Sequence, residues 1–159
     1  MDFHETALLA AKGDASAALL LYTHFYKELY YIAFLSLGEE NAAVSAVKTA
    51  AEICLSSCGE CRNEASFRAY FIRILCEQII SAFRSQRKSG FVYIEEGNQI
   101  KDSLMKLTEA ERLSVIVYSL CDYNERQISI VTGLKPEAVE TKLQSAKNKL
   151  SSLEEALYL

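Results

Sequence analysis

Apolar residues recur at spacings of three and four along most of the chain. Leu21, Phe25 and Leu29 follow this spacing in the first third, and Phe71 and Leu75 follow it near the middle. A period close to 3.6 residues is typical of helices that bury one face and expose the other. The pattern therefore predicts an all-α protein, with helices at about 14–37, 39–54, 63–88, 108–120, 124–132 and 137–153.

The breaks between these stretches coincide with glycine. Gly13, Gly38 and Gly133 each lie between apolar stretches, where a residue without a Cβ ends a helix most readily. The whole chain has six glycines and one proline, which is too few for the many tight turns of an all-β protein. The turn formers and the apolar period therefore agree on an all-α fold.

A change of pattern at residues 89–103 divides the chain. Glycines at positions 90 and 97 flank a short apolar alternation, Phe91-Val92-Tyr93-Ile94, which has no helical period. Such a stretch is typical of a linker that docks loosely on a neighbouring surface. We expect two small helical domains, at 1–88 and 104–159, joined by a linker at 89–103.

The second expected domain carries the signals of a helix-turn-helix. Asn124 and Gln127 have the spacing of a capping box, as do Thr108 and Glu111 earlier in the domain. A helix barely two turns long then runs to Gly133, and the only proline of the chain stands at the first position of the next helix. This order is typical of a motif that presents its second helix to the major groove of DNA.

Polar side chains around the last helix are candidate DNA-binding residues. Val139, Leu143 and Ala146 occupy the inward positions, which leaves the polar residues on the other faces. Lysine contacts phosphates, whereas Thr, Gln and Ser reach base edges. The candidate set is Lys135, Thr141, Lys142, Gln144, Ser145, Lys147 and Lys149. The alternative is a helical hairpin whose polar face is only solvated.

Composition and charge narrow the classes of function. The 159 residues are 50% hydrophobic and 24% charged, which is ordinary for a soluble globular protein. No stretch approaches the ~18 uncharged apolar residues of a membrane span, and the first residues lack the basic start of a signal peptide. We therefore expect a cytoplasmic protein with no membrane partner. The net charge is −4, divided as −1 over residues 1–90 and −3 over 91–159, so any DNA contact needs a local cluster of cations.

The five cysteines are interpreted as reduced thiols, because their number is odd and no secretory signal precedes them. Cys54, Cys58 and Cys61 have the C-x3-C-x2-C spacing of iron–sulfur radical enzymes, but those enzymes need a barrel of roughly 200 residues or more. A zinc site would need Cys76 or His24 as a fourth ligand. Such cysteines are more often small core residues or oxidisable loop residues. No metal or other cofactor is therefore expected.

Catalytic chemistry is not expected from this sequence. The chain has two histidines, His4 and His24, and neither belongs to a recognisable nucleophile motif. A phosphate-binding glycine loop is also absent. Six aromatic residues between Tyr22 and Phe34 would suit stacking on unpaired bases, although aromatics at helical spacing more often belong to a core.

Several short motifs, taken in order, resemble a known family. They are Ala11-Lys12-Gly13-Asp14, the stretch from Ser66 to Ile74, the stretch from Leu107 to Arg112, Gln127-Ile128-Ser129, and the run from Ala146 to Leu150. Together they resemble a small bacterial RNA polymerase sigma factor of the extracytoplasmic-function kind, over nearly the whole chain. The resemblance implies a transcription initiation factor. A region 2-like domain would bind the core RNA polymerase clamp and help melt promoter DNA, and a region 4-like helix-turn-helix domain would read the upstream promoter element. The resemblance is also compatible with an anti-sigma factor as a further partner.

The resemblance, together with helix geometry, selects a second candidate DNA-binding set near the end of the helix at 63–88. The set is Arg73, Arg84, Gln86, Arg87 and Lys88. Positions 73, 84 and 88 are separated by 11 and 4 residues, close to whole turns, so they lie on one side of the helix. These three cations would contact the phosphate backbone of single-stranded DNA. The alternative is that these cations only complement the negative end of the helix dipole.

Two departures from the family pattern keep another hypothesis open. Family members carry an acidic D-A-E-D-L-x-Q-E-x-F run where this chain has the nearly uncharged stretch from Ala42 to Ala51. In the last helix, Glu140 and Ser145 stand where Lys or Arg is common. The alternative is a degenerate sigma-like helical protein that acts through protein–protein interaction without promoter recognition.

Overall fold

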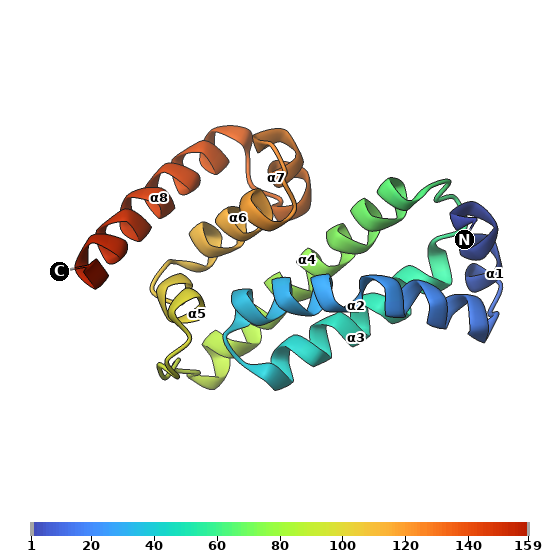
Figure 1. Cartoon of the computed structure of the whole chain (residues 1–159), viewed down its shortest axis with the longest axis horizontal. Helices are drawn as coiled ribbons and strands as arrows, with labels where there is room; N and C mark the ends of the chain where they lie inside the picture. The colour runs from blue at the N-terminus through green and yellow to red at the C-terminus, as the bar shows by residue number, and fades with distance from the viewer. Residues whose placement is uncertain (1, 159) are drawn as a thin grey trace.

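The computed structural model describes the backbone of residues 2–158 and the side chains of residues 2–151. Within this range the chain forms helices and no strands, so the predicted all-α fold is confirmed (Figure 1). The helices are α1 (Phe3–Ala11), α2 (Ala15–Leu37), α3 (Glu40–Ser57), α4 (Glu64–Ser89), α5 (Gln99–Leu104), α6 (Glu109–Leu120), α7 (Glu125–Thr132) and α8 (Pro136–Tyr158).

Helices α1–α4 form the first unit, in which α2, α3 and α4 lie side by side (Figure 1). Phe25 of α2 and Phe67 and Phe71 of α4 are buried in its core, and neighbouring rings of this group lie 5.1 and 5.9 Å apart. Ala43 and Ala50 of α3 are fully buried. Small side chains at these positions let α3 approach its neighbours closely, which is why the alanine-rich stretch forms an inner helix.

Local capping signals start the helices where the sequence predicts. Thr108 accepts a hydrogen bond from the backbone N–H of Glu111 and begins α6, and Asn124 does the same from Gln127 at α7. At α4 the cap is Asn63, and Ser66 is its partner three residues later. Each of these boxes satisfies two backbone donors that a helix leaves unpaired at its start.

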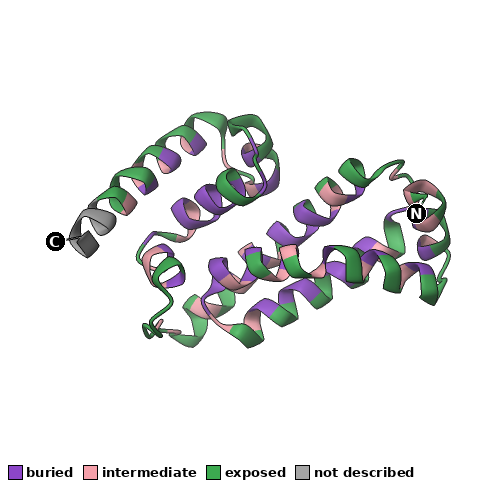
Figure 2. Ribbon diagram, in the orientation of Figure 1, coloured by how far each residue is buried: buried purple, intermediate pink, exposed green. Residues whose placement is uncertain are grey.

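The second unit consists of α6, α7 and α8, which pack on one another around Leu113, Ile128, Val139 and Leu143. Gly133 ends α7 with φ 76°, a left-handed conformation that favours glycine, and the chain then turns into α8. Residues 111–117 of α6 are all buried, so this helix is covered on every side, whereas the buried positions of α8 lie on the side that faces α6 (Figure 2).

The two units are in contact. Helix α7 packs on α4 and α6 packs on α2, so the second unit lies along the first (Figure 1). The intervening segment at 89–103 contains the helix α5, and Lys101 of α5 is only 1% exposed. Most of the segment is nevertheless exposed, including Val92 and Ile94 at 77% and 75%, so Lys101 is its one buried anchor and its role as a linker stays a prediction. No helix in the described part of the chain is long and apolar enough to cross a membrane.

Candidate nucleic-acid interface

Two candidate residues of α8 contact Glu111 of α6. The Lys149 ammonium lies 2.7 Å from a Glu111 carboxylate oxygen, and the Ser145 hydroxyl donates a hydrogen bond to the other oxygen. Burial by itself raises the pKa of Glu111, but hydrogen bonds from Lys149, Ser145 and Thr108 outweigh it and lower the pKa to about 2. Glu111 is thus a charged group inside the second unit. Its negative charge is balanced by Lys149 and hydrogen-bonded by Ser145, both from α8.

Lysines 142 and 147 are placed differently. The Lys147 ammonium lies 4.7 Å from the centre of the Tyr118 ring of α6, a cation–π contact that holds this side chain along the surface of the unit. Lys142 is half-buried, whereas Lys135 is exposed immediately before α8. Lys135 is therefore accessible to a phosphate that approaches the start of the helix.

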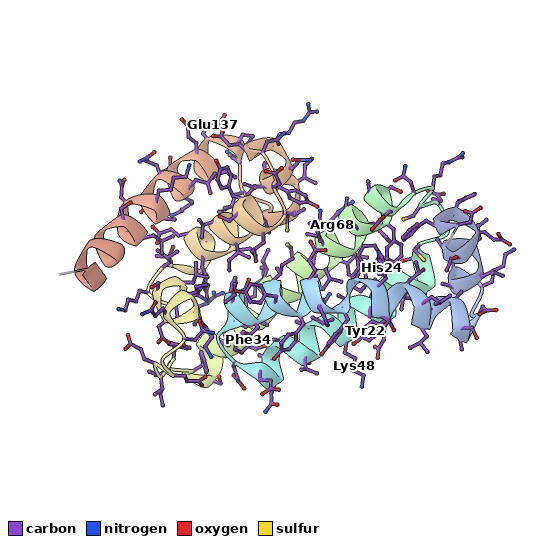
Figure 3. All side chains as sticks on the ribbon, in the orientation of Figure 1. Tyr22, His24, Phe34, Lys48, Arg68 and Glu137 are labelled. Carbon is purple, nitrogen blue, oxygen red and sulfur yellow. The ribbon has the colours of Figure 1, made fainter. Side chains whose placement is uncertain are left out.

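The outward face of α8 carries carboxylates. Glu137, Glu140, Thr141 and Gln144 are exposed, on the side opposite the buried Val139. Glu137 lies at the outer edge of α8, away from α1–α4 (Figure 3). The Thr141 hydroxyl donates to the Glu137 backbone carbonyl over 3.1 Å. This face mixes two negative charges with side chains that can read base edges.

The four cations of the candidate set on α4 are exposed, including Arg87 at 57%, and only Gln86 is half-buried. Arg73, Arg84 and Lys88 are exposed. Arg87 forms an ion pair with Glu109 at the start of α6. Gln86 is half-buried and donates from its side-chain amide to the Leu37 carbonyl at 2.9 Å, so it faces α2.

Arg73 stands beside the second unit. Its Nε lies 3.9 Å from a Glu77 oxygen, and both side chains are well exposed. It also borders a hollow of about 280 Å³ whose other walls include Tyr70 of α4 and Gln127 and Ile130 of α7. The cationic side of α4 thus runs along the junction with α6 and α7.

One ion pair within the first unit was not predicted from the sequence. Arg68 of α4 donates from Nε to both carboxylate oxygens of Glu28 in α2, at 2.9 and 3.1 Å. Both side chains of this bidentate pair are half-buried. Figure 3 labels Arg68. The residues are 40 positions apart, and no local pattern in the sequence joins them. Burial raises the pKa of Tyr123, which lies near this pair, to about 12, so its phenol stays protonated at neutral pH.

The cysteines do not assemble a metal site. Among the described residues, no group of three or more His, Cys, Asp or Glu side chains is placed to hold a metal ion. Cys54 and Cys58 are fully buried, and burial raises the pKa of both thiols. The structure therefore gives no support to the alternative of zinc at Cys54, Cys58 and Cys61, and it places the first two as core residues.

The aromatic residues of α2 form a half-buried ladder against the core. Tyr22, Tyr26, Tyr30 and Phe34 follow one another at centre distances of 5.2, 5.8 and 5.8 Å, and the last two pairs are stacked. Figure 3 labels the two ends of the ladder, Tyr22 and Phe34. These rings pack against the hydrophobic core and on one another, which agrees with the core interpretation.

Comparison with solved structures gives a likeness that extends over the whole fold. No protein-family model matches the sequence, and no curated protein matches it. Among solved structures, the one described as CnrH in complex with the cytosolic domain of CnrY matches with a TM-score of 0.72 and 23% identity, over 98% of this chain and 99% of that chain. CnrH is an extracytoplasmic-function sigma factor. The chain therefore has the all-helical fold of such a sigma factor.

Proposed function

We propose that this protein is a sigma factor-like transcription initiation factor that directs core RNA polymerase to promoters. The observation that carries the proposal is the likeness to CnrH over 98% of one chain and 99% of the other, with both helical units included in the same order. Fold alone does not specify function, so the proposal also draws on the site. The first unit corresponds to region 2, the second to region 4, and residues 89–103 to the linker between them.

In this proposal α7, Gly133 and α8 form the helix-turn-helix. The start of α8 enters the major groove, where Thr141 and Gln144 reach base edges and Lys135 and Lys142 contact phosphates. On the first unit, the exposed Arg84 and Lys88 of α4 follow the promoter backbone.

The charges of α8 make this DNA contact a weak one by itself. Glu137 and Glu140 are exposed on the same face and repel phosphates, while Glu111 neutralises Lys149. The polymerase must therefore supply most of the affinity and hold the second unit against the DNA. This arrangement predicts low affinity for a promoter fragment in the absence of polymerase.

The same charges favour a second candidate function, in which the protein keeps the sigma fold but acts only on other proteins. The outer side of α3, which includes Val44, Lys48 and Thr49, also lacks the acidic run typical of the family. Anti-sigma binding is compatible with both functions. CnrH is found with the cytosolic domain of CnrY, and we propose that this chain also binds an anti-sigma domain.

The deciding experiment combines the purified protein with core RNA polymerase. Co-elution in gel filtration and run-off transcripts from promoter fragments are expected of an initiation factor. Glu137→Gln with Glu140→Gln, which removes only the repulsive charges, should raise transcription or leave it unchanged. Binding to polymerase or to an anti-sigma domain without any transcript would support the second function, and failure to bind polymerase would reject the first.

A further inference from the structure

Cys58 and Cys61 lie in one tight turn between α3 and α4, at the end of the first unit where α1 packs (Figure 1). The Cys61 backbone N–H donates to the Cys58 carbonyl at 3.0 Å, which closes a four-residue turn. Such a turn brings its first and fourth Cα atoms within about 7 Å of each other, and disulfides join Cα atoms about 4.4–6.8 Å apart. The backbone therefore holds these two residues at a separation that a disulfide can bridge.

The other cysteines are placed less favourably for a disulfide. Cys54 lies one helical turn before Cys58 on α3, and side chains four residues apart on a helix have Cβ atoms about 5–6 Å apart. A disulfide needs Cβ atoms about 3.5–4.5 Å apart, so the rigid backbone of α3 disfavours a bond between Cys54 and Cys58. Cys76 and Cys121 are buried in the fold, where a reagent in solution does not reach them.

The two thiols of the turn differ in exposure. Cys58 is fully buried, whereas Cys61 is half-buried and follows the exposed Glu60. A reagent in solution therefore meets Cys61 first, and Cys58 lies behind it as a second thiol. Burial raises the pKa of both thiols. Because the thiolate is the form that attacks a disulfide, we expect the reaction at neutral pH to be slow.

Both cysteines also contact α1. The Cys58 thiol donates to the Ala7 carbonyl, with 3.5 Å between sulfur and oxygen. The His4 ring donates from Nδ1 to the Cys61 carbonyl at 3.3 Å. One hydrogen bond thus runs from the turn to α1 and the other from α1 to the turn.

Close packing accompanies these hydrogen bonds. A Cβ added at Gly59 would lie 3.5 Å from the Ala11 Cβ, which is ordinary van der Waals distance, so the backbone of the turn lies directly on α1. Helix α1 has nine residues, and an isolated helix shorter than about 12–15 residues is marginal in water. The helical state of α1 therefore depends on its packing against its neighbours, which include this turn.

From these contacts we infer that Cys58 and Cys61 form a redox-modification site, a dithiol that a low-molecular-weight disulfide converts into an intramolecular disulfide. The Cys61 thiolate attacks one sulfur of the small disulfide, so a mixed disulfide forms and one small thiolate leaves. The Cys58 thiolate then attacks the Cys61 sulfur, which closes the bond between the two residues and releases the second small thiolate. The protein loses two protons and two electrons, and the small disulfide is reduced to two thiols.

Closing this bond changes the support of α1. The Cys58 sulfur loses its hydrogen, and with it the hydrogen bond to the Ala7 carbonyl, when it bonds to Cys61. Oxidation should therefore loosen α1 while the core between α2, α3 and α4 is kept. The turn lies at the opposite end of α4 from Arg84 and Lys88 (Figure 1). The inference thus does not rest on the proposed function.

Glutathione disulfide is the probe that tests the site. The reduced full-length protein, incubated with an excess of this probe until the reaction stops, should lose the mass of two hydrogen atoms. Peptide mapping should then join Cys58 to Cys61. Absence of a bond, or a bond between any other two cysteines, would overturn the site.

Three variants separate the roles of the thiols. Cys58→Ala should accumulate a glutathione adduct at Cys61, because no second thiol is present to resolve the mixed disulfide. Cys61→Ser should form neither the adduct nor the bond, since the remaining thiol of the turn is buried. Cys54→Ala is the matched control, which removes a neighbouring buried thiol and should close the bond as the wild type does. An unmodified Cys58→Ala protein would contradict the order of the two steps.

Circular dichroism checks that each variant keeps its helices. The mass measurement on the wild type decides the existence of the site even where a variant unfolds.

Hydrogen exchange measures the effect on α1. In the oxidised wild type the amides of α1 should exchange roughly fivefold or more faster than in the reduced protein, while the buried stretches of α3 and α4 keep their protection. Cys61→Ser treated with the same probe should show no change. Equal exchange of α1 in both redox states would overturn the link between the disulfide and α1. Neither measurement needs polymerase or DNA, so failure of the proposed function leaves both results unaffected.

Discussion

Replacing Glu111 by Gln removes one buried charge with almost no change in shape. The Glu111 side chain is 3% exposed, and its pKa falls from the ordinary 4.5 to about 2 in the folded protein. At ~1.4 kcal/mol per pKa unit the full shift corresponds to roughly 3 kcal/mol. Because Lys149 is 47% exposed and therefore screened, we expect about 2 kcal/mol of stabilisation at neutral pH.

The direction of the pH dependence follows from the lowered pKa. The unfolded chain binds the proton near pH 4.5, whereas the folded chain holds Glu111 ionised down to about pH 2. The stabilisation is therefore complete above pH 4.5 and is lost as the pH falls toward 2. In Glu111→Gln the new amide oxygen would still accept the hydrogen bond from the Thr108 backbone N–H, as glutamine does in capping boxes, whereas the Ser145 hydroxyl would have to accept from the new NH2 group instead of donating, so the difference reports the charge together with this one hydrogen bond.

Urea unfolding of the wild type and of Glu111→Gln at several pH values is the assay. The two stabilities should differ by about 2 kcal/mol at pH 7 and converge as the pH falls toward 2. Lys149→Met should remove a similar part of the pH dependence, because it leaves the carboxylate without its cation. Parallel stabilities of the wild type and Glu111→Gln across the acid range would refute the reasoning.

Two further predictions concern the candidate DNA contacts. Lys142→Glu combined with Lys147→Glu should strongly weaken binding of a promoter fragment in a gel-shift assay with core polymerase present, since each phosphate contact contributes to a salt-dependent attraction; unchanged binding would remove α8 from the interface. Neutralising Arg84, Arg87 and Lys88 together should reduce promoter melting with core polymerase, measured by permanganate footprinting, while the circular dichroism spectrum stays unchanged because exposed cations at a helix end contribute only about 0.3–1 kcal/mol each. Equal melting by the wild type and the triple variant would contradict that role.

Only part of the candidate site could be predicted from the sequence. Helical spacing correctly separates the inward residues of α8, such as Val139 and Leu143, from the polar ones. Helical spacing does not tell which polar residue faces solvent and which faces α6. The positions on the two flanks of the buried side recur with the same spacing, so the sequence pattern cannot distinguish them. Ser145 and Lys149 prove to contact Glu111, and their roles in DNA binding remain predictions, as do the domain boundaries at 88 and 104.

The sequence by itself determines the helices of this protein. Asn124 with Gln127, and Thr108 with Glu111, fix helix starts through contacts three residues apart, and Gly133 ends α7 through its own backbone freedom. Such signals are local, so they act before any tertiary contact exists. The resemblance to sigma factors follows from the order of these elements.

Only the tertiary structure decides how the two units are held together. The hydrogen bond from Arg112 to Ser36 joins residues 76 positions apart, and the one from Gln86 to Leu37 joins residues 49 apart. A long-range contact of this kind depends on which helix faces meet, and an arginine in an amphipathic pattern carries no mark of its partner. The physical reason is that the unpaired carbonyls at the end of a helix are bonded by whichever donors packing brings near, here Arg112 and Gln86 at Ser36 and Leu37 of α2.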